Sequence, residues 1–146
     1  MRLPKTLLLP LLVFIGCGKS QQMGHEHEGP DGDSTNANRA LYDQVMDIHD
    51  EVMPKVGDIY ELKKKLLEKI ASTPNMVAEE KSKLEKRIAD LDSVGEMMMG
   101  WMHSFQPLPD TVDQERAREY LESEMEKIRK VKEAMLEIIE KEKGSN

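Results

Sequence analysis

Apolar residues recur every three or four positions through most of the chain after Asn38, and this spacing constrains the fold more than any other feature. Residues three or four apart share one face of an α-helix, so each such stripe predicts a helix that buries one side. No strand-like alternation is visible, so we expect an all-α fold. The first stripe consists of Leu41, Val45, Ile48, Val52, Val56, Ile59, Leu62, Leu66 and Ile70. The second consists of Val77, Leu84, Ile88, Leu91, Val94, Met98, Trp101 and Phe105, and the third of Leu121, Met125, Ile128, Val131, Met135 and Ile138.

Two proline-containing segments, STPN and QPLPD, separate the three stripes. Thr73 in the first segment and Asp110 in the second are residue types that cap the N-terminus of a following helix. Short connections make successive long helices antiparallel neighbours. We therefore expect an antiparallel three-helix bundle with coiled-coil-like packing over residues 38–143, followed by a tail at residues 144–146.

Pro54 lies inside the first predicted helix. Proline removes one backbone hydrogen bond and clashes with the carbonyl four residues earlier, here that of Asp50, so we expect a kink. Two interpretations are open: the kink only bends the helix around its core, or it shapes a pocket beside His49 and Met53.

The first residues have a different character from the helical region. Arg2 and Lys5 precede a mostly apolar run from Leu7 to Ile15. This run is too short to cross a bilayer as a helix, which needs about 20 residues. A charged start, a short apolar centre and a small residue before the cut are typical of a secretory signal peptide, which we assign to residues 1–16.

The sequence Phe14-Ile15-Gly16-Cys17 resembles a bacterial lipobox, where signal peptidase II cleaves and the cysteine becomes the lipidated first residue. Cys17 is the only cysteine, so no intramolecular disulfide is possible, and lipidation would consume a thiol that is otherwise free. The alternative is an ordinary signal peptide with an accidental cysteine. Gly18 stands where Asp would favour the inner membrane. We expect a lipid-anchored protein of the cell envelope, in the outer membrane, that faces the periplasm or the cell surface.

Residues 17–37 are polar, rich in glycine and nearly free of large apolar side chains, which predicts a lipid-anchored flexible tether. A coil of this length reaches about 25 Å, enough to hold a domain clear of the headgroups. The tether contains His25 and His27, and alternating histidines can bind Cu(II), Zn(II) or Ni(II) weakly. The alternative is a solvated polar linker.

The charge of the chain limits its partners. The formal net charge is −7, and loss of the signal peptide with its two positive side chains would leave −9. An acidic surface argues against nucleic acid and against a second, electrostatic membrane contact. No catalytic motif is present, no nucleophile has a plausible base beside it, and no carboxylate lies on a predicted apolar face where its pKa would shift. We therefore do not expect an enzyme.

Methionine and histidine are concentrated in two segments, GEMMMGWMHSF at residues 95–105 and VMDIHDEVMPK at residues 45–55. Folding the first two predicted helices back about residue 73 places position i level with about position 146 − i. Both segments then lie near one end of the bundle, where these residues gather: Met46, His49, Met53, Met97, Met98, Met99, Met102 and His103.

Two interpretations of this cluster remain open. Thioether sulfur with imidazole favours Cu(I) or Ag(I), and the ring of Trp101 could shield such a cation. Methionine is also an adaptable core filler, and Met98 lies directly in the apolar stripe. If a metal binds, its predicted ligands are Met46, His49, Met53, Met102 and His103.

Three segments carry a resemblance to a known family: HDEVMPKVGDIYELK (His49–Lys63), IADLDSVGEMMMGWMHSF (Ile88–Phe105) and YLESEMEKIRKV (Tyr120–Val131). From residue 39 to about residue 140 the chain resembles small bacterial lipoproteins that are often labelled "viral A-type inclusion protein". The family has no established activity, so the resemblance implies a lipoprotein and not a reaction.

Two functions are compatible with these features. The first is an envelope structural or interaction lipoprotein, in which a tethered helical bundle offers a face to an envelope protein partner. The second is a lipoprotein that binds a copper or silver ion through the methionine and histidine cluster.

Overall fold

The computed structural model describes residues 30–109 and 111–145, and all regular structure in this part of the chain is α-helical. The predicted all-α, three-helix bundle is confirmed. The first predicted helix is divided into two pieces, which we name together the first leg. The four helices are α1 (Pro30–Val52), α2 (Lys55–Ser72), α3 (Ala78–Ser104) and α4 (Gln114–Lys143). The predicted signal peptide, Cys17, His25 and His27 lie outside the described residues.

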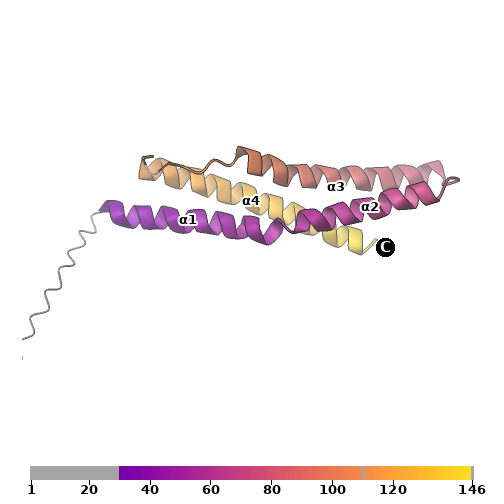
Figure 1. Ribbon diagram of the computed structural model, residues 1–146, viewed down its shortest axis with the longest axis horizontal. Helices are drawn as coiled ribbons and strands as arrows, with labels where there is room; N and C mark the ends of the chain where they lie inside the picture. The colour runs from indigo at the N-terminus through magenta and orange to yellow at the C-terminus, as the bar shows by residue number, and fades with distance from the viewer. Residues whose placement is uncertain (1–29, 110, 146) are drawn as a thin grey trace, which may run out of the picture.

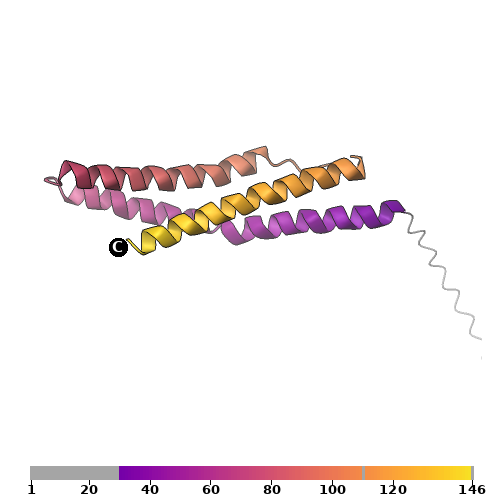
Figure 2. The same cartoon turned by 180° about the vertical axis from the view of Figure 1, so that it is seen from behind.

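The bundle is elongated, and α4 runs obliquely along it, from beside α1 toward α2 (Figures 1 and 2). At one end α1 lies along the N-terminal part of α4, and at the other end α2 pairs with α3. α3 runs toward the end of the bundle where α1 begins, but it stops short of that end. A connection without helical structure continues from there to the beginning of α4 (Figure 1). The third layer over the first turns of α1 and α4 is therefore this connection and not a helix.

The first leg is interrupted at Met53 and Pro54, where we predicted only a kink. The N–H of Met53 still donates to the carbonyl of His49 at 2.8 Å, which completes the last turn of α1. Pro54 has no N–H to continue the pattern, so a new helix starts at Lys55. The break lies directly beside the predicted methionine and histidine cluster.

Two predicted helix caps are not the ones that the structure uses. Thr73 ends α2, and its carbonyl accepts from the N–H of Met76 in a turn, so α3 starts later, at Ala78, without a side-chain cap. α4 is capped by Asp113, whose carboxylate accepts from the N–H of Arg116 at 3.2 Å. Asp110, the predicted cap, lies outside the described residues.

The start of α1 also differs from the prediction, because residues 30–37 are helical although we assigned them to the tether. Proline is well suited to a first helical turn, since its N–H would be unpaired there in any case. Farther along α1, the side-chain amide of Asn38 donates to the backbone carbonyl of Gln114 at 2.9 Å and to its side-chain oxygen at 2.8 Å. These two bonds hold this end of α1 against the start of α4.

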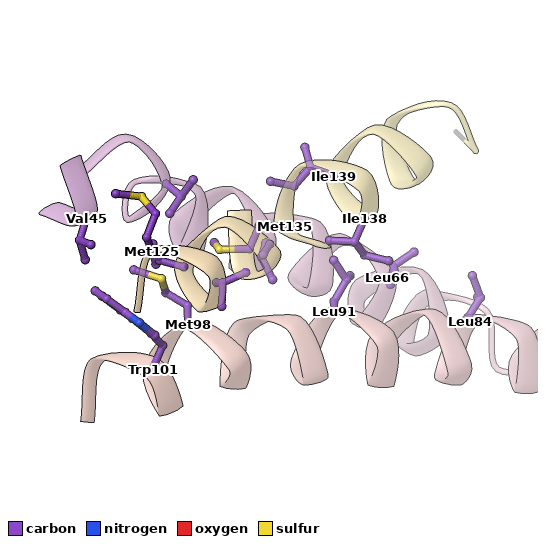
Figure 3. Packing of buried hydrophobic residues seen from close by; sticks show 14 residues of the cluster. Val45, Leu66, Leu84, Leu91, Met98, Trp101, Met125, Met135, Ile138 and Ile139 are labelled. Atoms are coloured by element: carbon purple, nitrogen blue, oxygen red, sulfur yellow. The ribbon is translucent and has the colours of Figure 1, made fainter. Parts of the chain in front are cut away.

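The core runs along the whole bundle and contains side chains from all four helices (Figure 3). Every residue of the three predicted stripes is buried or partly buried, with one exception. Val77 is 68% exposed, because it lies in the turn before α3. The buried cluster consists of Val45, Val52, Ile59, Leu66, Leu84, Leu91, Met98, Trp101, Met125, Ile128, Val131, Met135, Ile138 and Ile139.

None of the helices among the described residues combines the length and the apolar character needed to cross a bilayer.

Candidate functional site

The candidate site is centred on His49, in the last turn of α1, and Trp101, in the last turn of α3. Their ring centroids are 5.8 Å apart and the ring planes are tilted by 35°. Trp101 is buried, whereas the side chain of His49 keeps 17% of its surface exposed. The pair therefore lies at the edge of the core, within reach of solvent.

One side of α1 faces α3 along this contact. Tyr42 lies 6.1 Å from Phe105 between ring centroids, and His49 follows seven residues after Tyr42 on the same side of the helix. Met46 and Met53 flank His49 at spacings of three and four, so they belong to this side as well. Both methionines are partly buried.

α3 presents Met102 toward the first leg. The ion pair between Asp92 and Lys63 of α2, at 2.6 Å, identifies the side of α3 that faces this leg. Helical residues are spaced by about 100°, which places Met102 between the Asp92 side and the Trp101 side. Met102 is partly buried and packs against the core.

The remaining members of the predicted cluster are separated from this site. Met97 and Met99 are exposed at 41% and 40%, and Met98 is fully buried in the core. His103 is exposed, and it follows Trp101 by two positions, so it lies about 160° around α3 from the indole. The structure therefore brings His49 against Trp101, leaves Met46, Met53 and Met102 partly buried, and turns His103 away.

His49 has a defined hydrogen bond on one ring nitrogen. Its Nδ1 lies 2.8 Å from Oδ1 of Asp50. An ionised carboxylate can only accept, so Nδ1 carries the hydrogen, and in the neutral imidazole Nε2 then keeps its lone pair. A histidine fixed in this way has the arrangement that metal-binding histidines use.

Two buried carboxylates were missed by the sequence analysis. Glu124 is 3% exposed and accepts from the indole N–H of Trp101 at 2.9 Å and from Lys127 at 2.7 Å. Glu142 is 1% exposed and accepts from the guanidinium of Arg87 at 2.6 Å. The part of the prediction that kept carboxylates off the apolar faces is wrong.

The spacing of these carboxylates contained the signal. Glu124 follows Leu121 by three and Glu142 follows Ile138 by four, so both lie on the third stripe. A buried indole also needs an acceptor for its N–H, and this need could have pointed to an acidic residue on a neighbouring helix.

A row of aromatic rings fixes the connection after α3. Phe105 stacks on Trp101 at 5.0 Å and on Tyr120 at 6.1 Å between centroids. The hydroxyl of Tyr120 accepts from the N–H of Gln106 at 2.8 Å. The connection is thereby held against α4 directly after α3 ends.

A groove of about 610 Å³ lies between this connection and the first turns of α1 and α4, and we name it the end groove. It exists because the connection fills the place of a third helix only in part. No feature of the sequence predicted this groove. Its lining residues are Thr35, Asn36, Asn38, Arg39, Tyr42, Pro107, Leu108, Pro109, Val112, Gln114, Ala117 and Leu121.

The shifted pKa values belong to ion pairs along the helices. Hydrogen bonds from Lys86 and Lys141 lower the pKa of Asp90, and a hydrogen bond from Lys130 lowers that of Glu126. The pKa of Lys127 is raised, chiefly by its hydrogen bond to Glu124. These shifts mark charge pairing between neighbouring side chains.

The described part of the chain contains no group of three or more His, Cys, Asp and Glu side chains arranged to hold a metal ion. Each buried side-chain nitrogen or oxygen in the same part has a hydrogen-bond partner.

Comparison with known proteins gave no match: no family model, no curated protein and no solved structure is similar enough to the chain to be matched with it. The resemblance to small bacterial lipoproteins therefore stays a prediction from the sequence.

Proposed function

We propose that the protein is a lipid-anchored lipoprotein of a bacterial cell envelope, and that its helical bundle is a structural or interaction module. The observation that carries this proposal is the lipobox-like sequence ending at Cys17, placed a short distance before a bundle with a closed core. The anchor would supply the location, and the surface of the bundle would supply the contacts.

The position of the anchor limits where the bundle can lie. Only residues 18–29 separate Cys17 from the first residue of α1. Even a fully extended chain of this length reaches only about 45 Å. The end of the bundle that contains the start of α1 and the end groove would therefore stay close to the membrane.

The buried polar groups support a structural role over a catalytic one. Glu124 accepts from Trp101, and Glu142 accepts from Arg87, so both carboxylates join α4 to α3. Glu124 also pairs with the ammonium group of Lys127 on its own helix. Among the described residues, no buried side-chain nitrogen or oxygen beside these carboxylates is left without a hydrogen-bond partner. These contacts support a protein that works by binding.

The acidic surface supports a protein partner over a lipid surface. A chain with net charge −7, or −9 without its signal peptide, is repelled by anionic headgroups and by nucleic acid. Exposed apolar side chains occur on three helices, for example Tyr60 on α2, Met99 on α3 and Leu136 on α4. Such side chains are available for contact with another protein.

The anchor is tested by growing a bacterial host that expresses the chain with a tagged fatty acid. The wild-type protein should carry the label and fractionate with membranes, and Cys17→Ser should remain as unlabelled precursor. Unlabelled wild-type protein in a host that labels a control lipoprotein would refute the anchor.

The interaction is tested by photo-crosslinking in the same cells, with the crosslinker placed in turn at Tyr60, Met99 and Leu136. We expect a discrete adduct with an envelope protein from one face of the bundle and not from the others. The same adduct should be lost with Cys17→Ser. If all three positions give no discrete adduct, the bundle does not act through a protein contact on these faces.

A further inference from the structure

We propose that His49, with the sulfur atoms of Met46, Met53 and Met102, forms a binding site for a soft monovalent cation, Cu(I) or Ag(I), beside the ring of Trp101. This inference goes beyond the proposed envelope role and does not depend on the lipid anchor. It rests on the side of α1 that faces α3 and on the contact between His49 and Trp101.

Met46 and His49 lie on α1, and Met53 directly follows its last residue. Side chains three or four apart on a helix have Cβ atoms about 5–6 Å apart, so Met46 and Met53 both flank the imidazole of His49. The hydrogen bond from the N–H of Met53 to the carbonyl of His49 keeps this last turn of α1 intact. Met102 comes from the opposite helix, next to Trp101.

The imidazole is prepared to act as a ligand. Asp50 occupies Nδ1 of His49, and the lone pair of Nε2 is the one available to a metal. A carboxylate on the far nitrogen also fixes the tautomer and the orientation of the imidazole ring. The exposed side of His49, 17% of its side chain, gives a cation access from solvent.

The indole adds a second attraction. A cation within about 6 Å of a tryptophan ring is attracted by the negative face of the ring. The N–H of Trp101 is bonded to the Glu124 carboxylate, and this bond to an anion increases the electron density of the ring. Glu124 and the stacked Phe105 also hold the indole in one position.

The donor set selects the class of ion. Thioether and imidazole donors suit Cu(I) and Ag(I), whereas Ca²⁺ and Mg²⁺ need oxygen ligands. No group of three His, Cys, Asp and Glu side chains is available for a harder ion within residues 30–109 and 111–145. Met98 is excluded from the site because it is fully buried in the core.

The test uses the fluorescence of Trp101, which is the only tryptophan in the chain and therefore reports on this site alone. The reference protein is the full chain in detergent, in which the soft donors from Cys17 to the start of α1 are removed. These changes are Cys17→Ser, Met23→Leu, His25→Ala and His27→Ala. Silver(I) nitrate is the probe, because Ag(I) mimics Cu(I) without redox chemistry.

We expect a saturable change in Trp101 fluorescence that is complete at one equivalent of Ag(I). A triple variant with Met46→Leu, Met53→Leu and Met102→Leu keeps the side-chain volume and removes the sulfur, so its fold should be retained. Its affinity for Ag(I) should fall by at least about tenfold, and Asp50→Asn should weaken binding by a similar factor. Cu(I) in an anaerobic competition titration should give the same order of affinities.

The matched control carries Met97→Leu, Met99→Leu and His103→Asn, which are the exposed donors of the same segment. Its affinity should equal that of the reference. The proposal is overturned if the reference gives no saturable fluorescence change, or if the sulfur-free triple variant binds Ag(I) as tightly as the reference. Circular dichroism of each variant checks that the helices are intact. None of the variants changes His49, so its ring contact with Trp101 does not have to be disrupted for the test.

Discussion

The indole N–H of Trp101 donates a hydrogen bond of 2.9 Å to Oε2 of Glu124, and both side chains are withdrawn from solvent. This bond joins the last turn of α3 to α4. Because Trp101 also contacts His49, the three antiparallel parts of the bundle meet at one ring. The bond fixes how α3 is rotated against α4, since the indole can reach Glu124 from only one side of its helix.

Glu124→Leu should lower the free energy of unfolding by about 1–3 kcal/mol, because it leaves the buried indole N–H without an acceptor. Glu124→Gln should cost less, since its amide oxygen can still accept. Urea unfolding followed by circular dichroism measures both changes. In a double-mutant cycle, Trp101→Phe should make Glu124→Leu less damaging. Equal stability of wild type and Glu124→Leu would show that the bond does not hold the helices.

The second buried carboxylate gives a stronger prediction. Arg87 donates through Nε and Nη2 to Glu142 at 2.9 and 2.6 Å, and Glu142 is 1% exposed. Arg87→Met should cost about 3–5 kcal/mol, because it leaves an uncompensated buried charge. Arg87→Met combined with Glu142→Leu should recover most of this loss, which chemical denaturation can measure. A double variant no more stable than Arg87→Met alone would contradict this account.

The three helical stripes could be predicted because helix periodicity is a local property of the chain. Leu91, Ile128 and Met135 were assigned to the core from spacing alone, and they are buried. Helix ends were less predictable, since Thr73 and Asp110 are good caps by residue type but the chain uses Asp113 and a turn at Thr73. Cap choice depends on where the helix packs, and that is a tertiary property.

The candidate site was only partly predictable for the same reason. Spacing placed Met46, His49 and Met53 on one face, and the hairpin placed that face near the second methionine segment. The rotation of α3 decided that Trp101 and not His103 faces His49. This rotation is set by side-chain packing and by the bond to Glu124, which requires knowledge of α4.

The end of the bundle that contains the turn between α2 and α3 offers a matched pair of core substitutions. Leu84 is 3% exposed, and Val77, predicted to lie on the same stripe, is 68% exposed. Leu84→Ala should lower the free energy of unfolding by about 2–5 kcal/mol, because it leaves a cavity. Val77→Ala should leave stability almost unchanged. Thermal and urea denaturation of the two variants side by side would test the packing, and similar losses in both would contradict it.

Asp90 provides a test by pH. It accepts from Lys86 at 3.0 Å and from Lys141 at 3.5 Å, and these bonds hold its pKa below the usual value of 3.8. A lowered pKa in the folded state stabilises the fold above the unfolded pKa, and the contribution is lost as the pH falls through the folded pKa. Asp90→Asn should therefore lower the melting temperature slightly at neutral pH and have no effect in strong acid.

The control for this test is the same substitution in a chain with Lys86→Gln and Lys141→Gln. Without the two ammonium groups, the change in melting temperature caused by Asp90→Asn should be the same at neutral pH and in strong acid. High salt should also reduce the effect in the wild-type background, because the pair is exposed and screened. A pH-dependent difference of the same size in the control background would assign the effect to another group.

The N-terminal boundary of the folded unit follows from Asn38, which is 7% exposed and bonds twice to Gln114. Asn38→Ala should lower the free energy of unfolding by about 1–3 kcal/mol, because it removes both bonds and leaves the Gln114 side-chain oxygen without this donor. Gln44→Ala, at an exposed position of the same helix, serves as the control and should have little effect.

A pair of deletions then separates the tether from α1. Removal of residues 18–29 should leave the melting temperature unchanged, because this polar segment has little apolar surface to bury. Removal of residues 18–37 also takes the first helical turns of α1 and one wall of the end groove, so the melting temperature should fall. If both deletions are silent, the helix before Asn38 does not contribute to the fold, and the boundary lies at Asn38, as the sequence alone suggested.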